Sequence, residues 1–197
     1  MEYRGFNISI EQDLDPINPR ESDNLGIMVC FHRRYNLGDK HEFKTGQDFM
    51  DWVSGEQVVM LPIYIYDHSG ITINTTGFSC PWDSGQIGYI YVTLADLEEE
   101  GLPMDRAERI LKAEVEEYDD YLTGNVWGYS ISPVRANIGI QCDDACWGFY
   151  GTDGQIEAEA QAKSAIDYAI KNFREQAKQG HATAIQMKSF MRTSWAH

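Results

Sequence analysis

Two segments of the chain carry apolar residues at helical spacing and predict two long helices. Between Pro103 and Gly124 an apolar residue recurs every three or four positions, so one stripe of that helix is expected to be buried. A capping-box sequence at 152–155 opens a second such pattern, which ends at Gly180. The stripes are Ala107, Leu111, Val115, Tyr118 and Leu122 in the first segment, and Ile156, Ala162, Ile166, Ala169, Ile170, Phe173 and Ala177 in the second.

Shorter apolar runs, bounded by turn residues, predict strands. The strands do not alternate regularly with helices, and this order is typical of an antiparallel sheet. We therefore predict an α+β fold, with a mostly antiparallel sheet and the two main helices packed on one face. The strands are expected at 25–31, 57–66, 71–75, 86–93, 126–134, 136–141 and 147–150, with short helices inside 43–53 and 93–100.

The length of 197 residues and the 43% hydrophobic content suit one domain rather than two. We expect a single domain over 1–197, with an N-terminal arm at 1–24, an α+β core at 25–180 and a C-terminal tail at 181–197. Residues 11–24 hold two prolines and five acids, which disfavour a central strand there. The tail has no clear period but carries three large side chains suited to docking on a second subunit of a homodimer: Phe190, Met191 and Trp195.

Charge and composition narrow the classes of partner. Acidic residues outnumber basic ones 31 to 16, and the formal net charge of -15 disfavours direct nucleic-acid binding. No apolar run approaches the roughly 20 residues of a membrane span and no signal-peptide pattern begins the chain, so we expect a cytoplasmic protein without membrane association. No phosphate-loop motif is present, and the spacing of Cys142 and Cys146 is unusual for zinc, so neither cofactor nor metal is predicted.

Two similar acidic turns, at 67–70 and 83–85, flank one predicted strand and are expected to lie side by side. Asp and Ser bond backbone amides in tight turns and Gly supplies positive φ, so a purely structural role explains these residue types. The alternative is a small enzyme or a ligand- or metal-binding module. In that case His68 and Asp83 act as acid-base or ligand groups, and Cys80 is an optional nucleophile. Whether the chain is an enzyme is left open by its sequence.

The segment 94–120 holds 11 acids against three basic residues. Acids in the C-terminal half of a helix oppose its dipole, so helix stability alone does not favour them there. A row of carboxylates can imitate a phosphate backbone and occupy the basic nucleic-acid channel of another protein. The alternative is a solvated face that keeps the protein soluble. The predicted contact row is Glu114, Glu116, Glu117, Asp119 and Asp120.

The most basic spot of the chain is the sequence His-Arg-Arg-Tyr at 32–35, directly after a predicted strand. Its cations either bond to carboxylates of the same molecule or pair with an anionic ligand. Both interpretations are compatible with the sequence.

Five strings of the sequence resemble a family of mostly uncharacterised proteins from bacteriophages and bacterial mobile elements: YDHSG, SCPWDSGQIGYIYVT, CFHRRYNLGD, EVEEYDDYLTGNVWGY and CWGFYG. The similarity covers roughly 23–151. This resemblance implies a phage-type accessory protein in the cytoplasm of a host cell. With the acidic row, it leads to the hypothesis of a DNA mimic that inhibits a host defence complex. The expected partner is a protein or ribonucleoprotein with a basic nucleic-acid channel, such as a restriction enzyme or, for an anti-CRISPR protein, a CRISPR effector.

Overall fold

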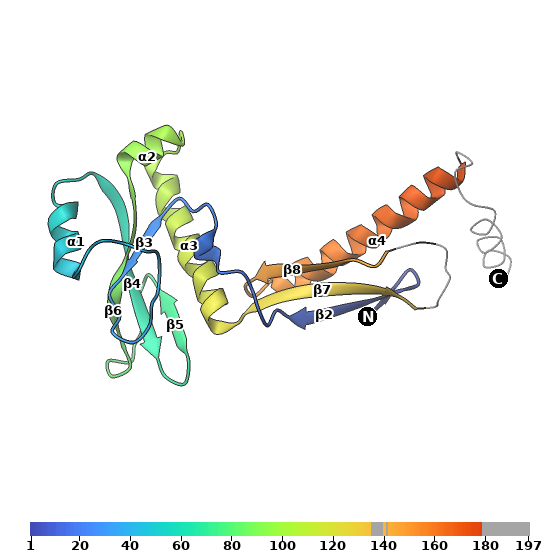
Figure 1. Ribbon diagram of the computed structural model, residues 1–197, viewed down its shortest axis with the longest axis horizontal. Coiled ribbons are helices and arrows are strands. Elements are labelled where there is room, and N and C mark those ends of the chain that lie inside the picture. The colour runs from blue at the N-terminus through green and yellow to red at the C-terminus, as the bar shows by residue number, and fades with distance from the viewer. Residues whose placement is uncertain (135–139, 141, 179–197) are drawn as a thin grey trace. The chain divides into compact units, whose positions relative to one another are not determined.

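The computed structural model describes residues 1–134, 140 and 142–178, which form two compact units (Figure 1). One unit is Ile17–Gly124, and the other joins Met1–Pro16 to the chain from Asn125 onward. Each unit has an antiparallel sheet and one long helix, so the predicted α+β class with antiparallel pairing is confirmed. The described strands divide into two sheets instead of one, and each sheet packs against its own long helix. The single-domain boundaries stay a prediction.

The unit Ile17–Gly124 is built on a sheet with the strand order β3-β6-β4-β5, in which all neighbours are antiparallel. Its elements are η1 (Pro19–Glu21), β3 (Ile27–Cys30), α1 (Gly46–Val53), β4 (Val58–Asp67), β5 (Ile71–Asn74), β6 (Ser84–Thr93), α2 (Leu94–Glu99) and α3 (Met104–Thr123). Side chains alternate along β6, because successive residues of a strand point to opposite faces. Ile90 and Val92 join the core beneath α3, whereas Tyr89 and Tyr91 pack with Phe49 of α1. Helices therefore cover both faces of this sheet.

The helix α3 confirms the apolar stripe expected between Pro103 and Gly124. Four residues of the stripe are buried against the sheet: Ala107, Leu111, Val115 and Tyr118. Leu122 packs at the edge of the same cluster, and the helix ends at Gly124, whose positive φ of 72° is a conformation that glycine adopts without strain.

A bulge and a close backbone approach fix the middle of β6. Ile63 pairs with Gly88 and the next residue, Tyr64, pairs with Gln86, so Ile87 is the extra residue of β6 and turns into the core. A Cβ atom on Gly88 would lie 2.0 Å from the carbonyl oxygen of Val29 on β3. Only glycine therefore permits this approach of the two strands.

The second unit has the strand order β1-β2-β7-β8 and consists of β1 (Glu2–Tyr3), β2 (Phe6–Gln12), β7 (Val126–Pro133), β8 (Ala145–Tyr150) and the helix α4 (Gly154–Lys178). In β2, Phe6 and Ile8 are buried between exposed residues and pack with Tyr129 and Ile131 of β7. These N-terminal residues were expected in an arm but instead form an internal strand, because their alternating apolar side chains complete the core under α4.

The helix α4 packs on this sheet through small and branched residues, Ala158, Ala162, Ile166 and Ile170. Ile156, which the sequence places in the stripe, is 67% exposed, and Ala158 is buried in its place. The strand expected at 147–150 is confirmed as part of β8. Except for Ile140, the strand expected at 136–141 lies outside the described residues, as does the tail at 181–197.

Replacing Gly88 with alanine is expected to destabilise the protein, because the added methyl group collides with the backbone of β3. Overpacking of this kind costs about 1–3 kcal/mol. The matched control is Gly85→Ala in the same strand, where a Cβ atom meets nothing within 4 Å. Urea denaturation gives both free energies of unfolding, and equal values would contradict the pairing of β3 with β6.

Candidate functional site

The two acidic turns lie side by side, as the sequence predicts. Tyr66 of β4 pairs with Ser84 of β6, and the amide of Asp67 donates to the carbonyl of Asp83 at 2.8 Å. The pairing brings the imidazole Nδ1 of His68 to 3.4 Å from Oδ2 of Asp83, and the two side chains are 63% and 40% exposed. His68 and Asp83 therefore form a contact that is open to solvent.

Asp67 fixes the basic segment that follows β3. Its carboxylate accepts hydrogen bonds from the guanidinium of Arg34 and, at 3.3 Å, from the hydroxyl of Tyr35. The ring of Tyr35 stacks on that of His32, with the centroids 5.0 Å apart. Arg34 therefore bonds to a carboxylate of the same molecule, which is the first of the two interpretations given for 32–35.

Cys80 lies beside His68 and Asp83. It contacts the carboxylate of Asp83, whereas acyl transfer requires contact with the histidine base. Its Sγ is 3.8 Å from Oδ2 of Asp83, and the hydroxyl of Ser84 donates to its carbonyl oxygen. A cysteine nucleophile needs a base within hydrogen-bond reach, oriented by a third group. Among the described contacts none joins Cys80 to His68. The three residues therefore lie close together but lack the Cys–His contact of a Cys-His-Asp triad. The described part of the chain also holds no group of three or more His, Cys, Asp or Glu residues arranged for a metal ion.

The predicted acidic row divides into internal and external members. Glu114 is internal: its side chain is 10% exposed and it accepts hydrogen bonds from the amides of Leu25 and Gly26. Asp119 is also internal, since it accepts from the hydroxyl of Thr72 and the amide of Ile73, each at 2.7 Å. Both carboxylates hold other segments against α3, and neither belongs to an outward-facing row.

The remaining three acids of the row differ in exposure. Glu116 is 65% exposed and lies 3.7 Å from Lys112 one turn earlier. Glu117 is exposed, yet partial burial of its carboxyl group, together with the nearby charge of Glu114, raises its pKa above the usual value. Asp120 is half-buried and has an interaction partner within the structure.

Arg20, which sequence reasoning did not single out, organises the internal acids. Its side chain is only 3% exposed, and its guanidinium forks onto both oxygens of Asp39 at 3.0 and 2.6 Å. A third nitrogen donates to Glu114 at 3.1 Å. Burial alone lowers the pKa of Arg20, but the hydrogen bonds and charges of the two carboxylates outweigh it and raise the pKa. The available signal was a single cation within the acidic segment 11–24.

Comparison of the chain with protein-family models, with curated proteins and with solved structures finds no match. The resemblance to phage and mobile-element proteins therefore stays a prediction. In the described part of the chain, no helix has the length and apolar character needed to cross a membrane.

Replacing Arg20 with methionine is expected to destabilise the protein strongly, because Asp39 and Glu114 are then left as partly buried charges without their cation. Breaking a buried ion pair in this way costs about 3–5 kcal/mol. Arg34→Met is the control, since Arg34 is 67% exposed and its pair with Asp67 lies at the surface. Exposed pairs contribute about 0–1 kcal/mol. Chemical denaturation of both variants tests the difference, and a small effect of Arg20→Met would contradict this role.

Replacing Glu117 with glutamine is expected to raise the free energy of unfolding at pH 7. The pKa of Glu117 is higher in the folded than in the unfolded state, so its ionisation opposes folding once the pH exceeds both values. The gain should vanish at pH 3, where the carboxyl group is protonated in both states. Denaturation at the two pH values measures this. The control Glu116→Gln should be neutral or slightly destabilising at pH 7, and a loss of stability in Glu117→Gln at pH 7 would reverse the sign argued here.

Proposed function

We propose that the chain is a phage-type accessory protein that inhibits a host nucleic-acid-targeting complex by binding its basic channel through an acidic surface. The observation that carries this proposal is the distribution of charge between the two units. Residues 17–124 hold 20 acids and eight basic residues, a net charge of -12, whereas the rest of the chain holds 11 and eight, a net charge of -3. The negative field that attracts a cationic partner therefore arises mainly from one unit.

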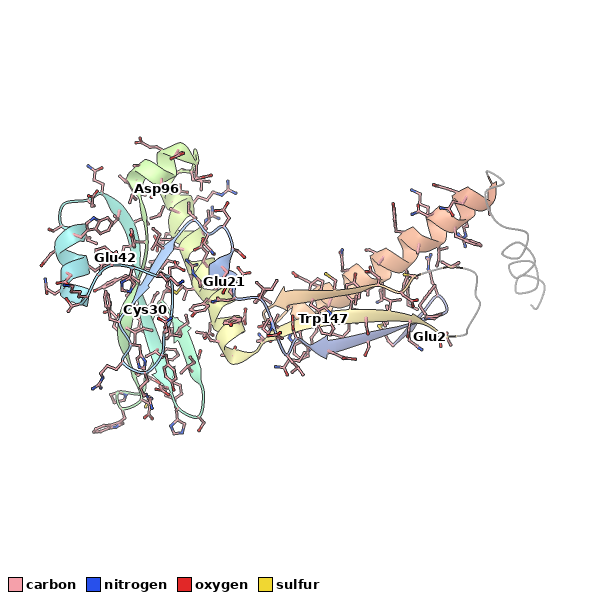
Figure 2. All side chains as sticks on the ribbon, in the orientation of Figure 1. Glu2, Glu21, Cys30, Glu42, Asp96 and Trp147 are labelled. Atoms are coloured by element: carbon pink, nitrogen blue, oxygen red, sulfur yellow. The ribbon has the colours of Figure 1, made fainter. Side chains whose placement is uncertain are left out.

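The surface that supports this proposal lies earlier in the chain than the predicted row. We define the α2–α3 acidic surface as five exposed acids, Glu98, Glu99, Glu100, Asp105 and Glu108. Within the described part of the chain, no ion pair neutralises any of the five. Arg106 and Arg109 are exposed in the same stretch, so the surface keeps an excess of three negative charges. Figure 2 labels Asp96, on the α2 helix that carries the first two of these acids.

Helix stability does not explain all of these acids. Asp105 lies in the first turn of α3, where the helix dipole favours a negative charge. Glu98, Glu99 and Glu100 instead occupy the C-terminal end and cap of α2, where the dipole disfavours them. These acids are present although they cost helix stability, and they remain unpaired. An unpaired anionic patch is suited to contact with a cationic partner.

A second candidate function uses the turn cluster, by which we mean His68, Cys80 and Asp83 in and beside the two acidic turns, as a small enzyme or as a ligand- or metal-binding module. The contact between His68 and Asp83 favours it, since both groups are exposed and can exchange a proton with a bound molecule. Trp82, which is 90% exposed in the same turn, provides an aromatic surface nearby. The position of Asp83 between Cys80 and His68 argues against a cysteine nucleophile in this candidate.

The triple variant Glu98→Lys, Glu99→Lys and Glu100→Lys is expected to lose inhibition while keeping its fold, because lysines at the end of α2 suit the helix dipole. The measurement is the plating efficiency of a targeted phage on cells that carry a CRISPR effector or restriction enzyme and produce the protein. The control reverses three exposed acids elsewhere in the same unit, Glu21, Glu42 and Glu56, and changes the net charge equally. Figure 2 labels Glu21 and Glu42 on other segments of this unit.

The outcomes of this experiment separate the two candidates. Loss of protection in the triple variant but not in the control supports the acidic surface, and binding to the isolated complex should then weaken with rising salt. Full protection by the triple variant rejects it. Loss of protection only in a His68→Gln, Asp83→Asn variant favours the turn cluster. Equal loss in both charge-reversed proteins assigns the effect to net charge and contradicts a specific contact.

A further inference from the structure

The segment between β3 and α1 lines an open cavity of about 460 Å³ within the unit Ile17–Gly124. Its lining is rich in basic and protonatable side chains, although the unit is strongly acidic. Small-molecule sites commonly range from roughly 300 to 1,000 Å³, so the volume suits a compact organic ligand. The basic and protonatable lining residues are His32, Arg33, Lys40, His41 and Lys44.

The cations of this cavity are not neutralised by the chain itself. Arg33, Lys40 and Lys44 are exposed, and within the described residues no carboxylate pairs with any of them. Asp39 is the one acid of the lining, and both of its oxygens are already bound by Arg20, one of them also by the amide of Met28. Burial raises the pKa of the Cys30 thiol, also in the lining, to about 12, so this group contributes no negative charge at neutral pH.

His41, a residue of the cavity lining, carries a buried polar atom without a hydrogen-bond partner. Its Nε2 lies 3.1 Å from the carbonyl oxygen of Cys30, to which it donates. Its Nδ1 is buried and has no hydrogen-bond partner, and it is the only such side-chain atom in the described part of the chain. Buried polar atoms without a partner are rare in folded proteins and call for an explanation. This atom has almost no solvent-accessible surface, so the side chains that can hold a ligand here are the exposed cations of the lining.

Two aromatic residues complete the cavity. Phe31 and Phe43 belong to its lining, and their rings lie 5.1 and 6.0 Å from the ring of His41. Cationic groups and aromatic rings together match a molecule that has a phosphate and a less polar part. A nucleic-acid strand fits less well, because the net charge of -12 on the surrounding unit repels a polyanion over its whole length.

We propose that this cavity binds a small organic phosphate, such as a sugar phosphate or a mononucleotide, with its phosphate group held by Arg33, Lys40 and Lys44. Lysine and arginine are the usual phosphate-binding side chains, and charge-assisted hydrogen bonds are the stronger ones. This site is distinct from the α2–α3 acidic surface and has the opposite charge. The test below therefore succeeds or fails independently of the proposed inhibitory function.

The experiment titrates the full-length protein with adenosine monophosphate, ribose 5-phosphate and inorganic phosphate by isothermal calorimetry. The cavity variant is Arg33→Ala, Lys40→Ala, Lys44→Ala. The matched control is Arg106→Ala, Arg109→Ala, Lys112→Ala, which removes three exposed cations of α3 and changes the net charge equally. Circular dichroism confirms the fold of both, and His41→Gln provides a second, uncharged probe of the same cavity.

Saturable binding of an organic phosphate, weakened by roughly tenfold or more in the cavity variant and unchanged in the control, supports the proposal. Preference for either organic phosphate over inorganic phosphate supports a role for the aromatic groups. Absence of saturable binding by all three probes at millimolar concentration overturns it. Equal weakening of binding in both variants also overturns it, because this result indicates an effect of net charge alone. Tighter binding of a single-stranded oligonucleotide than of adenosine monophosphate overturns it as well, because that result indicates a nucleic-acid contact.

Discussion

The unit Ile17–Gly124 depends on the buried guanidinium of Arg20. A charge at this depth is stable only if its hydrogen-bond donors are satisfied and its charge is balanced, and Asp39 and Glu114 do both. The arrangement joins three segments that no strand pairing connects: the η1 region, the loop after β3 and the middle of α3. Lysine cannot replace it, because one point charge does not reproduce the fork on Asp39. The same network removes Glu114 from the acids that are exposed to solvent.

The sequence predicts the elements of this fold better than it predicts their assembly. The period of apolar residues is a local property, and it finds α3 with its buried stripe and most strands of the sheet beneath it. The division into two sheets depends on which strands pair. Phe6 and Ile8 find their partners in β7, more than a hundred residues away. No local pattern contains that information. The two prolines that follow β2 also indicate a loop, so a strand of only seven residues beside them is easily missed.

The candidate sites show the same limit. The proximity of the two acidic turns is predictable, because the first follows β4 and the second begins β6, the strand that pairs with it. The roles of Glu114 and Asp119 are not, since their partners are 94 and 47 positions away and in sequence they look like any other acid of the row. The basic spot at 32–35 is visible in the sequence, but only the fold separates Arg34, bound to Asp67, from Arg33, which joins Lys40 and Lys44 in the cavity wall.

Two surfaces of opposite charge on one unit act over different distances, and this makes both proposals physically compatible. The net charge of the unit determines the field outside the protein up to the Debye length of about 8–10 Å, beyond which salt screens it, and over this range it attracts cationic macromolecules and repels polyanions. At contact distance the nearest charges dominate, because the Coulomb energy falls as the separation grows. A small phosphate therefore encounters Arg33, Lys40 and Lys44 rather than the distant acids. Under the two proposals, the charge of the whole unit attracts the macromolecular partner, and the cations of the cavity bind the small ligand.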